Sequence, residues 1–431
     1  MATPPIGQRV PTGVVRPGVN RAAVQASLRQ HNLALVLGEI AAAGPKPLSR
    51  AGIASATGIT RATVSSLVDQ LVAGGLIEEL EPLVRPAAGR PPTPVVLASG
   101  RVAALGLEVN VDYLGVRVID LTGDTLAQAL VRVNSRGTSP QQTLGQLVKL
   151  ADQVIDQLPS TVKLAGAGLA VPGLVAKDSV QLVVAPNLGW WNLDMAAQLT
   201  EAAVAGESQR LADLSARLLV ANEANLAGLA HLRSGTLPDS SFLYLSGDVG
   251  IGAAVVIDGE ALGGQHGWAG ELGHVCVDPN GPVCTCGGTG CLETYAGKAA
   301  LMQAAGLDPE ASVLQLMEAA STPGPGGQQA NTALTQAGRA LGLALAVAIN
   351  LLDLTEVVLG GDLGKLAPQV LPFVEQELAT RTLTSLATRH INLSASALAP
   401  CPAINGAALA VLDQLMADPC GYLQGDSGLL C

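Results

Sequence analysis

One histidine and three cysteines lie within eighteen residues near the middle of the chain, and their spacing constrains the fold of that segment more than any other feature. They are His274, Cys284, Cys286 and Cys291. One imidazole and three thiolates are the ligand set of a closed tetrahedral zinc site. Glu271 and Glu293 flank the cluster on its two sides. The pattern therefore predicts a rigid, zinc-bound loop that presents hydrogen bonds to a polyol such as a sugar, with a purely structural zinc site as the alternative.

The length and composition of the chain predict a large protein of two or more domains. Of its 431 residues, 48% are hydrophobic, 14% charged and only 2% aromatic, so the core must consist mainly of Leu, Val and Ala. The first twenty residues lack the apolar segment of a signal peptide, and no apolar run with clean flanks reaches the length of a membrane span. We therefore expect a cytoplasmic protein that does not contact a membrane.

Charge is distributed unevenly along the chain. Residues 1–101 contain ten Lys and Arg against five Asp and Glu, a net charge of +5. The whole chain carries −11, so the remainder carries −16. A basic N-terminal region on an acidic body predicts that this region alone binds a polyanion, although chance asymmetry is an alternative explanation.

Residues 32–73 have the pattern of a helix-turn-helix. An apolar-faced helix over residues 32–43 is stopped by Gly44 and Pro45, and Ser49 could cap a second, short helix that ends at Thr57. After a turn at Gly58, Thr60 could cap a third helix over residues 61–73. The residues of this unit predicted to bind DNA are the two caps, Ser49 and Thr60, and the polar residues of the third helix, Arg61, Thr63, Ser65 and Ser66.

The segment that follows is typical of a wing. Residues 76–80 and 95–97 are predicted strands, and Gly89-Arg90-Pro91 lies in the extended segment between them. Arg90 in such a loop could enter a narrow, electronegative minor groove. For the helices, the alternative is a helical hairpin that packs against another part of the protein. For Gly89-Arg90-Pro91, the alternative is a plain linker. The order of the pieces favours DNA binding.

The acidic body contains a weak internal repeat. Residues 103–121 and 242–257 each read as a pair of strands, and each second strand ends in Val-Ile-Asp before a Gly turn. Helical segments follow both pairs. This order predicts two similar α/β lobes with a cleft between them.

Polar and aromatic residues are placed where a cleft would need them. Asn222 and Glu223 follow a predicted strand over residues 218–220, and such positions face the ligand crevice of an open α/β sheet. A simple helix cap is the alternative. Tryptophans that could stack on the face of a sugar are Trp190, Trp191 and Trp268, although large aromatic side chains more often pack in a core.

These motifs resemble those of the ROK family of repressors and sugar kinases, over residues from about Asn20 to Met416. The segment from Glu271 to Glu293 is similar to the zinc signature of the family. The N-terminal region resembles that of the repressor branch, especially the xylose-repressor subgroup, and free-standing kinases of the family lack it.

The resemblance implies an α/β protein with the actin-like ATPase (ribonuclease-H-like) fold. A winged helix-turn-helix DNA-binding domain is expected over residues 20–98, and a two-lobed sugar-binding domain over residues 101–418, with its zinc loop over residues 271–293. Residues 1–19 and 419–431 are expected to be flexible tails.

The resemblance also implies roles for single residues. Asn222, Glu271, His274 and Glu293 match family positions that bind sugar hydroxyls, and the backbone around Gly173 lines the same pocket. Glu223 stands at the position of the catalytic Asp of the kinases. The zinc ligands match His274, Cys284, Cys286 and Cys291. One ring nitrogen of His274 would bind zinc and the other would face the sugar.

The phosphate loops depart from the kinase pattern. The kinases have Asp-x-Gly-Gly-Thr-Lys after the first strand, whereas this chain has Glu108-Val-Asn-Val-Asp112-Tyr113. Both glycines that would let the backbone approach a phosphate are missing. Asp112 would repel a phosphate about 4 Å away by about 4 kcal/mol at an effective dielectric constant near 20. Val249 replaces the usual Thr of the second loop, and Asp248 adds a further charge. These changes, with Glu in place of the catalytic Asp, predict a loss of kinase activity.

The sequence thus predicts a sugar-responsive transcriptional regulator, a repressor of genes for the use of xylose or a similar carbohydrate that a sugar releases from operator DNA. Two alternatives stay open. One is an active ATP-dependent, glucokinase-like sugar kinase that also binds DNA. The other is a regulator whose N-terminal region binds a protein partner, with the sugar as a second signal. A homodimer or homotetramer is expected, because the operators of such regulators are palindromic.

Overall fold

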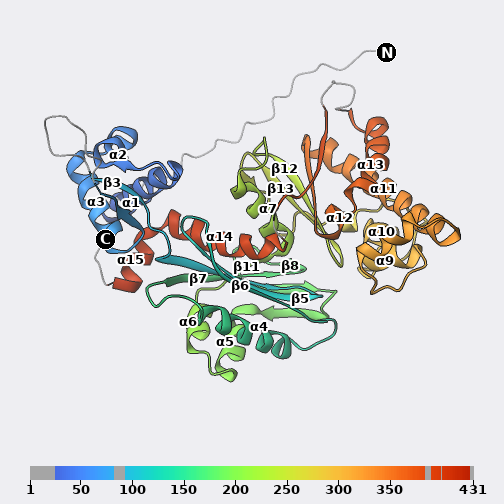
Figure 1. Ribbon diagram of the computed structural model, residues 1–431, viewed down its shortest axis with the longest axis horizontal. Coiled ribbons are helices and arrows are strands. Elements are labelled where there is room, and N and C mark those ends of the chain that lie inside the picture. The colour runs from blue at the N-terminus through green and yellow to red at the C-terminus, as the bar shows by residue number, and fades with distance from the viewer. Residues whose placement is uncertain (1–24, 82–92, 384–389, 399, 428–431) are drawn as a thin grey trace, which may run out of the picture.

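The computed structural model describes residues 25–81, 93–383, 390–398 and 400–427, and it consists of an N-terminal head and two α/β lobes (Figure 1). The head lies against the first lobe, and the second lobe lies at the far side of the molecule from the head (Figure 1). The predicted two-lobed α/β body with a helix-turn-helix head is therefore confirmed.

The head contains three helices and a small antiparallel sheet in the order β1-β3-β2. Its elements are α1 (Gln25–Ala42), β1 (Leu48–Ser49), α2 (Arg50–Thr57), α3 (Arg61–Ala73), β2 (Ile77–Glu79) and β3 (Pro94–Leu97). The predicted caps are present, because the Ser49 hydroxyl accepts the Gly52 N–H at 3.0 Å and the Thr60 hydroxyl accepts the Thr63 N–H at 3.3 Å. Helix α1 begins seven residues before the predicted start at Asn32. The wing strands β2 and β3 pair as predicted.

Lobe 1 is a five-stranded sheet in the order β11-β7-β4-β5-β6, with a three-stranded sheet β10-β9-β8 beside it. Helices α4 and α5 cover one face of the large sheet, because their apolar residues share one core with β4, β5 and β7. The elements of lobe 1 are β4 (Val102–Val109), β5 (Tyr113–Asp120), β6 (Thr125–Arg132), α4 (Pro140–Ile155), β7 (Lys163–Val171), β8 (Leu174–Val175), β9 (Gln181–Ala185), β10 (Trp190–Asp194), α5 (Met195–Ala205), α6 (Gln209–Ser215) and β11 (Leu219–Asn222).

Lobe 2 repeats the sheet of lobe 1. Its strands run in the order β16-β15-β12-β13-β14, with two antiparallel and two parallel pairs at the same places as in the five-stranded sheet of lobe 1. The elements are α7 (Glu223–Ser234), β12 (Phe242–Gly247), β13 (Ile251–Ile257), β14 (Glu260–Ala261), the 3-10 helix η1 (Leu272–His274), α8 (Glu293–Ala296), α9 (Lys298–Ala304), α10 (Val313–Ser321), α11 (Pro325–Leu352), β15 (Glu356–Gly360), α12 (Gly361–Lys365), α13 (Ala367–Arg381) and β16 (Asn392–Ala395). The weak sequence repeat therefore reflects a true repeat of topology.

Within the described residues, α11 is the one helix long and apolar enough to cross a bilayer. Two thirds of its most apolar window is buried in the fold, where it packs against α13 and α10. We therefore assign α11 to the core of lobe 2.

Helix α14 (Pro402–Ala417) joins the three parts of the molecule. It crosses the sheet of lobe 1 on the face opposite α4 and packs against α7 of lobe 2 (Figure 1). Three of its contacts leave no room for a side chain. A Cβ atom at Gly106 of β4, Gly168 of β7 or Gly406 of α14 would overlap a backbone carbonyl oxygen of the neighbouring element.

The prediction of a flexible tail over residues 419–431 is wrong for residues 419–427. These residues form α15 (Pro419–Ser427), which packs on α1 of the head. Leu423 is buried against Gly74 at the end of α3, and Asp418 accepts a hydrogen bond from Gln30 at 2.8 Å. The predicted tail over residues 1–19 lies outside the described residues. One apolar core thus combines the head with β4 of lobe 1, α14 and α15.

Leu423→Ala should lower the free energy of unfolding by about 3 kcal/mol, because it removes a buried side chain and leaves a cavity between α15 and the head. Urea denaturation measures the change. The matched control is Leu314→Ala, whose side chain is exposed and should cost little. A loss below about 1 kcal/mol for Leu423→Ala would mean that α15 does not stabilise the head.

Candidate functional site

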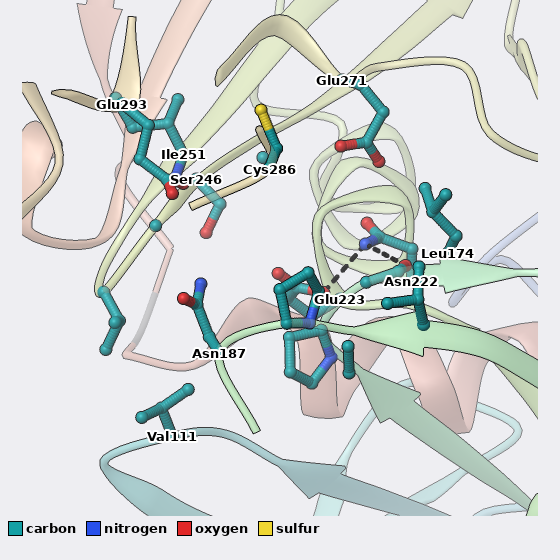
Figure 2. A pocket seen from close by; sticks show the side chains of 18 of the residues that line it. Val111, Leu174, Asn187, Asn222, Glu223, Ser246, Ile251, Glu271, Cys286 and Glu293 are labelled. Carbon is teal, nitrogen blue, oxygen red and sulfur yellow. Dashed lines mark hydrogen bonds between the residues drawn. The ribbon is translucent and has the colours of Figure 1, made fainter. Parts of the chain in front are cut away.

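A cavity of about 530 Å³ lies between the two lobes. The ends of β7 and β11 and the small sheet line it from lobe 1, and the β12–β13 turn and the metal loop line it from lobe 2. Asn222, Glu223 and Glu271 lie on one side of the cavity, and Asn187 and Glu293 lie on the other (Figure 2). The residues predicted to bind sugar that line this cavity are Gly173, Asn222, Glu223, Glu271, His274 and Glu293.

Asn222 is both a helix cap and a cavity residue. Its Oδ1 atom accepts the N–H groups of Ala224 and Asn225, at 2.8 and 3.3 Å, which starts α7. Its Nδ2 atom donates to the carbonyl of Gly173 at 3.0 Å and to Oε2 of Glu223 at 2.9 Å (Figure 2). A helix cap and a cavity residue are therefore compatible roles for Asn222, because the cap fixes the side chain whose amide faces the cavity.

The carboxylates of the cavity differ in their environment. Burial raises the pKa of Glu223 well above its ordinary value, and the nearby carboxylates of Glu108, Glu271 and Asp248 raise it further. Partial burial also raises the pKa of Glu271, although His274 opposes that shift. Glu293 is fixed, because its Oε2 atom accepts the backbone N–H of Ile251 at 2.9 Å. The carboxylate of Glu293 therefore ties α8 to the turn between β12 and β13.

The four predicted metal ligands lie together. The ligand atoms of His274, Cys284, Cys286 and Cys291 are all within 4.8 Å of one another. Nδ1 of His274 is 3.8 Å from Sγ of Cys284, and the Sγ atoms of Cys286 and Cys291 are 3.7 Å apart. A tetrahedral site with metal–sulfur bonds of about 2.3 Å has edges of roughly 3.8 Å, so the donor set fits a bound metal ion.

His274 connects the metal loop to the cavity. Its Nδ1 atom faces the cysteines, and its Nε2 atom lies 3.9 Å from Oε2 of Glu271. The N–H of Gly288 donates to Sγ of Cys286 at 3.4 Å and lowers the pKa of that thiol. Cys286 also lines the cavity. The loop therefore presents one histidine nitrogen and one carboxylate to a ligand in the cleft.

A second cavity of about 450 Å³ adjoins the first and shares Asn110, Glu223, Ser246 and Asp248 with it. Residues of both segments predicted to match the kinase phosphate loops line it, namely Glu108, Asn110, Asp112 and Tyr113 from the first and Asp248 from the second. Asp112 forms an ion pair with Lys298 at 2.9 Å, so its charge is largely offset. The prediction that Asp112 supplies the charge that repels a phosphate therefore needs correction.

Two buried carboxyl groups, Glu108 and Asp248, lie in the wall of the second cavity. Glu108 is only 1% exposed, accepts the Tyr113 hydroxyl at 2.7 Å through Oε1, and has no hydrogen-bond partner for Oε2 among the residues that the structure describes. Burial raises the pKa of Glu108 to about 8 and that of Asp248 to about 6. Asp362 adds to the shift of Asp248. Glu108 matches the Asp of the kinase pattern, so Asp248 is the carboxyl group that this chain adds to the cavity relative to that pattern.

The head presents part of its predicted DNA-binding set to solvent. On α3, Arg61, Thr63 and Ser66 are exposed and Ser65 is half-buried. The hydroxyls of Ser49 and Thr60 are used as helix caps, and Thr60 also contacts the Thr63 hydroxyl at 2.9 Å. Arg90 lies outside the described residues.

Five polar cavity residues were not among the predicted site residues. They are Asn110, Asn187, Ser246, Asp248 and Thr285. Asn187 stands in a turn and Ser246 at the end of β12, where a polar residue after an apolar run was the available signal. Asn110 is nearly buried between the two cavities, and only the folded chain shows that it reaches both.

Comparison with known proteins matches residues 104–414 to the ROK family and residues 34–83 to the MarR family. The chain is 28% identical over 394 residues to the xylose repressor of Bacillus subtilis, covering 91% of this chain and 97% of the repressor. It is 27% identical over 357 residues to the DNA-binding transcriptional dual regulator NagC of Escherichia coli, covering 79% and 83%.

Among solved structures, the chain is similar to a ROK family transcriptional regulator described as a homologue of the Escherichia coli MLC protein. The TM-score is 0.72 at 25% sequence identity, over 92% of this chain and 98% of that structure. The similarity includes the head as well as both lobes.

Glu108→Gln should stabilise the protein in a pH-dependent manner. Between the unfolded pKa near 4.5 and the folded pKa of about 8, the unfolded chain loses a proton that the folded chain retains, so stability falls as the pH rises through this window. The amide removes this loss and still accepts the Tyr113 hydroxyl. The variant should therefore match the wild type near pH 4.5 and exceed it increasingly up to pH 8.

Urea denaturation at pH 5, 7 and 9 tests this expectation, with the exposed Glu260→Gln as the matched control. A difference between Glu108→Gln and wild type that does not change with pH would show that Glu108 is ionised in the folded protein throughout.

Proposed function

The chain belongs to the ROK family, and on that premise we propose that it is a transcriptional regulator whose head binds operator DNA and whose cleft binds a sugar. One observation carries the proposal. The same chain combines a head that matches the MarR family with a two-lobed body whose cleft contains the predicted sugar-binding residues, and Asn110 and Val111 stand in place of the two glycines of the kinase phosphate loop. In this proposal the regulator is a repressor of carbohydrate-utilisation genes that the sugar releases from DNA.

Helix α3 is the proposed recognition helix. Its start exposes Arg61, Thr63 and Ser66, and the first residues of the second helix of a helix-turn-helix are those that reach base edges. Arg90 is proposed to contact the minor groove. Two heads on one palindromic operator require at least a homodimer, and a homotetramer satisfies the same geometry.

The proposed sugar grip consists of Asn222, Glu223, Glu271, His274 and Glu293, with the Gly173 backbone beside them. Each of these side chains can accept or donate a hydrogen bond to a hydroxyl group, and sets of convergent polar groups in a cleft are typical of sugar sites. The related repressors are named for xylose and for N-acetylglucosamine, so pentoses and hexoses are the first sugars to test.

Zinc is the proposed metal of the His274 cluster. Three thiolates and one imidazole at tetrahedral spacing favour zinc over the harder divalent ions, and no ligand position is left open for catalysis. The ion would supply no chemistry to the cleft. It would fix the ring of His274, so that Nε2 points toward the ligand beside Glu271.

The absence of kinase activity is part of the proposal. Phosphoryl transfer requires a cradle for the phosphates and a carboxylate base that takes the hydroxyl proton. In this chain Asn110 and Val111 replace the two glycines of the first kinase loop, and Asp248 adds a carboxyl group to the second. Glu223 stands at the position of the Asp base and accepts a hydrogen bond from Asn222 at 2.9 Å. The alternative is an active, glucokinase-like kinase with a DNA-binding head. Turnover of ATP at ordinary enzyme rates with a hexose or pentose would establish it.

The proposed signal passes from the cleft to the head through two helices. Helix α7 begins at Glu223 in the cavity, and its Leu226 lies against Gly406 of α14. Helix α14 continues into the core shared with the head. A sugar that favours one closure of the lobes would shift α7 against α14 and so change the position of the head. A tenfold loss of operator affinity requires only about 1.4 kcal/mol of differential binding.

Two variants should separate the DNA site from the sugar site. Glu271→Ala should weaken sugar binding about tenfold or more and leave operator affinity without sugar nearly unchanged. Arg61→Ala should weaken operator binding and leave sugar affinity nearly unchanged. Fluorescence anisotropy with promoter DNA and thermal-shift measurements with a sugar panel give the two affinities. Glu260→Ala and Arg210→Ala are matched controls, with exposed side chains outside both sites.

Three outcomes would contradict the proposal. Equal loss of both affinities in Glu271→Ala would make that residue structural. Unchanged DNA binding in Arg61→Ala would favour a protein partner for the head. Failure of every sugar to raise the melting temperature would contradict the proposal that the cleft binds a sugar.

Metal analysis of the purified protein should find about one zinc ion per chain. Cys286→Ser should lose the metal, lower the melting temperature and weaken sugar binding, because it loosens the loop that positions His274. Cys276→Ser is the matched control, since Cys276 is a free, exposed thiol outside the ligand set. A Cys286→Ser protein with full stability and full sugar affinity would refute this role for the metal loop.

A further inference from the structure

One wall of the cleft is apolar and lies next to the proposed sugar grip. The small sheet β10-β9-β8 forms this wall, and Leu174, Val184 and Trp191 are direct neighbours across its three strands. All three line the cavity. The row begins at Leu174, whose preceding residue, Gly173, accepts the hydrogen bond from Asn222. The apolar row therefore starts at the grip and leads away from it.

Trp191 is not needed for the core of lobe 1. Its neighbour Trp190 is 2% exposed and donates its indole N–H to the carbonyl of Thr138 at 2.9 Å, which anchors the β9–β10 hairpin. Because side chains alternate along a strand, Trp191 points to the opposite face and is 59% exposed. A large aromatic side chain held at the mouth of a polar cavity, on an anchored strand, is an available surface for a ligand.

The row is too long for one sugar ring. Neighbouring strands lie about 4.8 Å apart, so the three strands place Trp191 roughly 10 Å from Leu174. A pyranose measures roughly 5 Å between its first and fourth oxygens, given bonds of about 1.5 Å. A ring held by Asn222 and Glu271 would therefore not extend to Trp191. A second ring, attached to the first and lying along the sheet, would reach it.

We propose that the effector is a disaccharide or longer oligosaccharide. The sugar grip holds the terminal sugar unit, and Trp191 stacks on the apolar C–H face of the second sugar unit. The cavity volume of about 530 Å³ lies within the range of pockets that bury ligands larger than a single sugar. This inference rests on the proposed sugar-binding function, and it adds the length of the ligand and the residue that selects it.

Isothermal titration with matched pairs tests the ligand length. The pairs are xylose and xylobiose, glucose and cellobiose, and N-acetylglucosamine and its β-1,4-linked dimer. At least one disaccharide should bind ten or more times as tightly as its own monosaccharide, and it should also release promoter DNA at a lower concentration. If, in every pair that binds, the monosaccharide binds as tightly as its dimer, the inference is overturned. The proposed sugar-binding function would then stay in place.

Variants of Trp191 test the second subsite. Trp191→Ala should weaken the preferred disaccharide about tenfold, which corresponds to about 1.4 kcal/mol, while the affinity for the monosaccharide stays within twofold. Trp191→Tyr should retain most of the disaccharide affinity because it keeps an aromatic face. Trp268→Ala is the control, since Trp268 is a partly exposed tryptophan that packs on His266 and does not line the cavity.

The exposed position of Trp191 means that its variants should fold, and an unchanged melting temperature without sugar would show this. Equal weakening of both ligand lengths by Trp191→Ala, or no effect on either, would overturn the second subsite. If no sugar of either length binds the wild-type protein, the proposed sugar-binding function fails, and the inference fails with it.

Discussion

The close packing of α14 against its neighbours is the constraint on which the arrangement of the whole molecule depends. At Gly106 and Gly168 the helix lies directly on the backbone of the lobe 1 sheet, and at Gly406 the backbone of α7 lies directly on the helix. Interfaces packed at this distance cannot deform continuously, because any sliding creates overlap. A change in the angle between the lobes must therefore move α14 as a body or separate it from α7.

This constraint gives the proposed coupling between the cleft and the head a continuous path of packed elements. The head shares its apolar core with α14 and the first lobe, so it is not an independent module on a flexible linker. The cleft residues Asn222 and Glu223 form the start of α7, whose other contacts include α14. Each site is thus one element away from the same helix. The proposed coupling between the two sites would therefore act through α14.

Local patterns were predictable from the sequence, and long-range partnerships were not. The bounds of α3 and the caps at Ser49 and Thr60 follow from side chains a few residues away, and so does the grouping of His274 with the three cysteines. The repeat of the two sheets was visible as paired strands. By contrast, the ion pair of Asp112 with Lys298 joins residues that are 186 positions apart. The same limit applies to the helix after Pro419, whose polar composition gave no sign that Leu423 would enter the core of the head. The apolar row that ends at Trp191 depends on strand register, which composition does not specify.

The contribution of α15 to the head has a consequence for the order in which the protein matures on the ribosome. The helix-turn-helix is synthesised first, but its core is incomplete until Leu423 has emerged, about 350 residues later. At translation rates of about 5–20 residues per second, this interval lasts roughly 20 to 70 s. A nascent or truncated chain therefore carries a head whose apolar core is incomplete, and the head reaches its full stability only after both lobes have been synthesised. The fold thereby makes the stability of the first domain to be synthesised depend on the last helix of the chain that the structure describes.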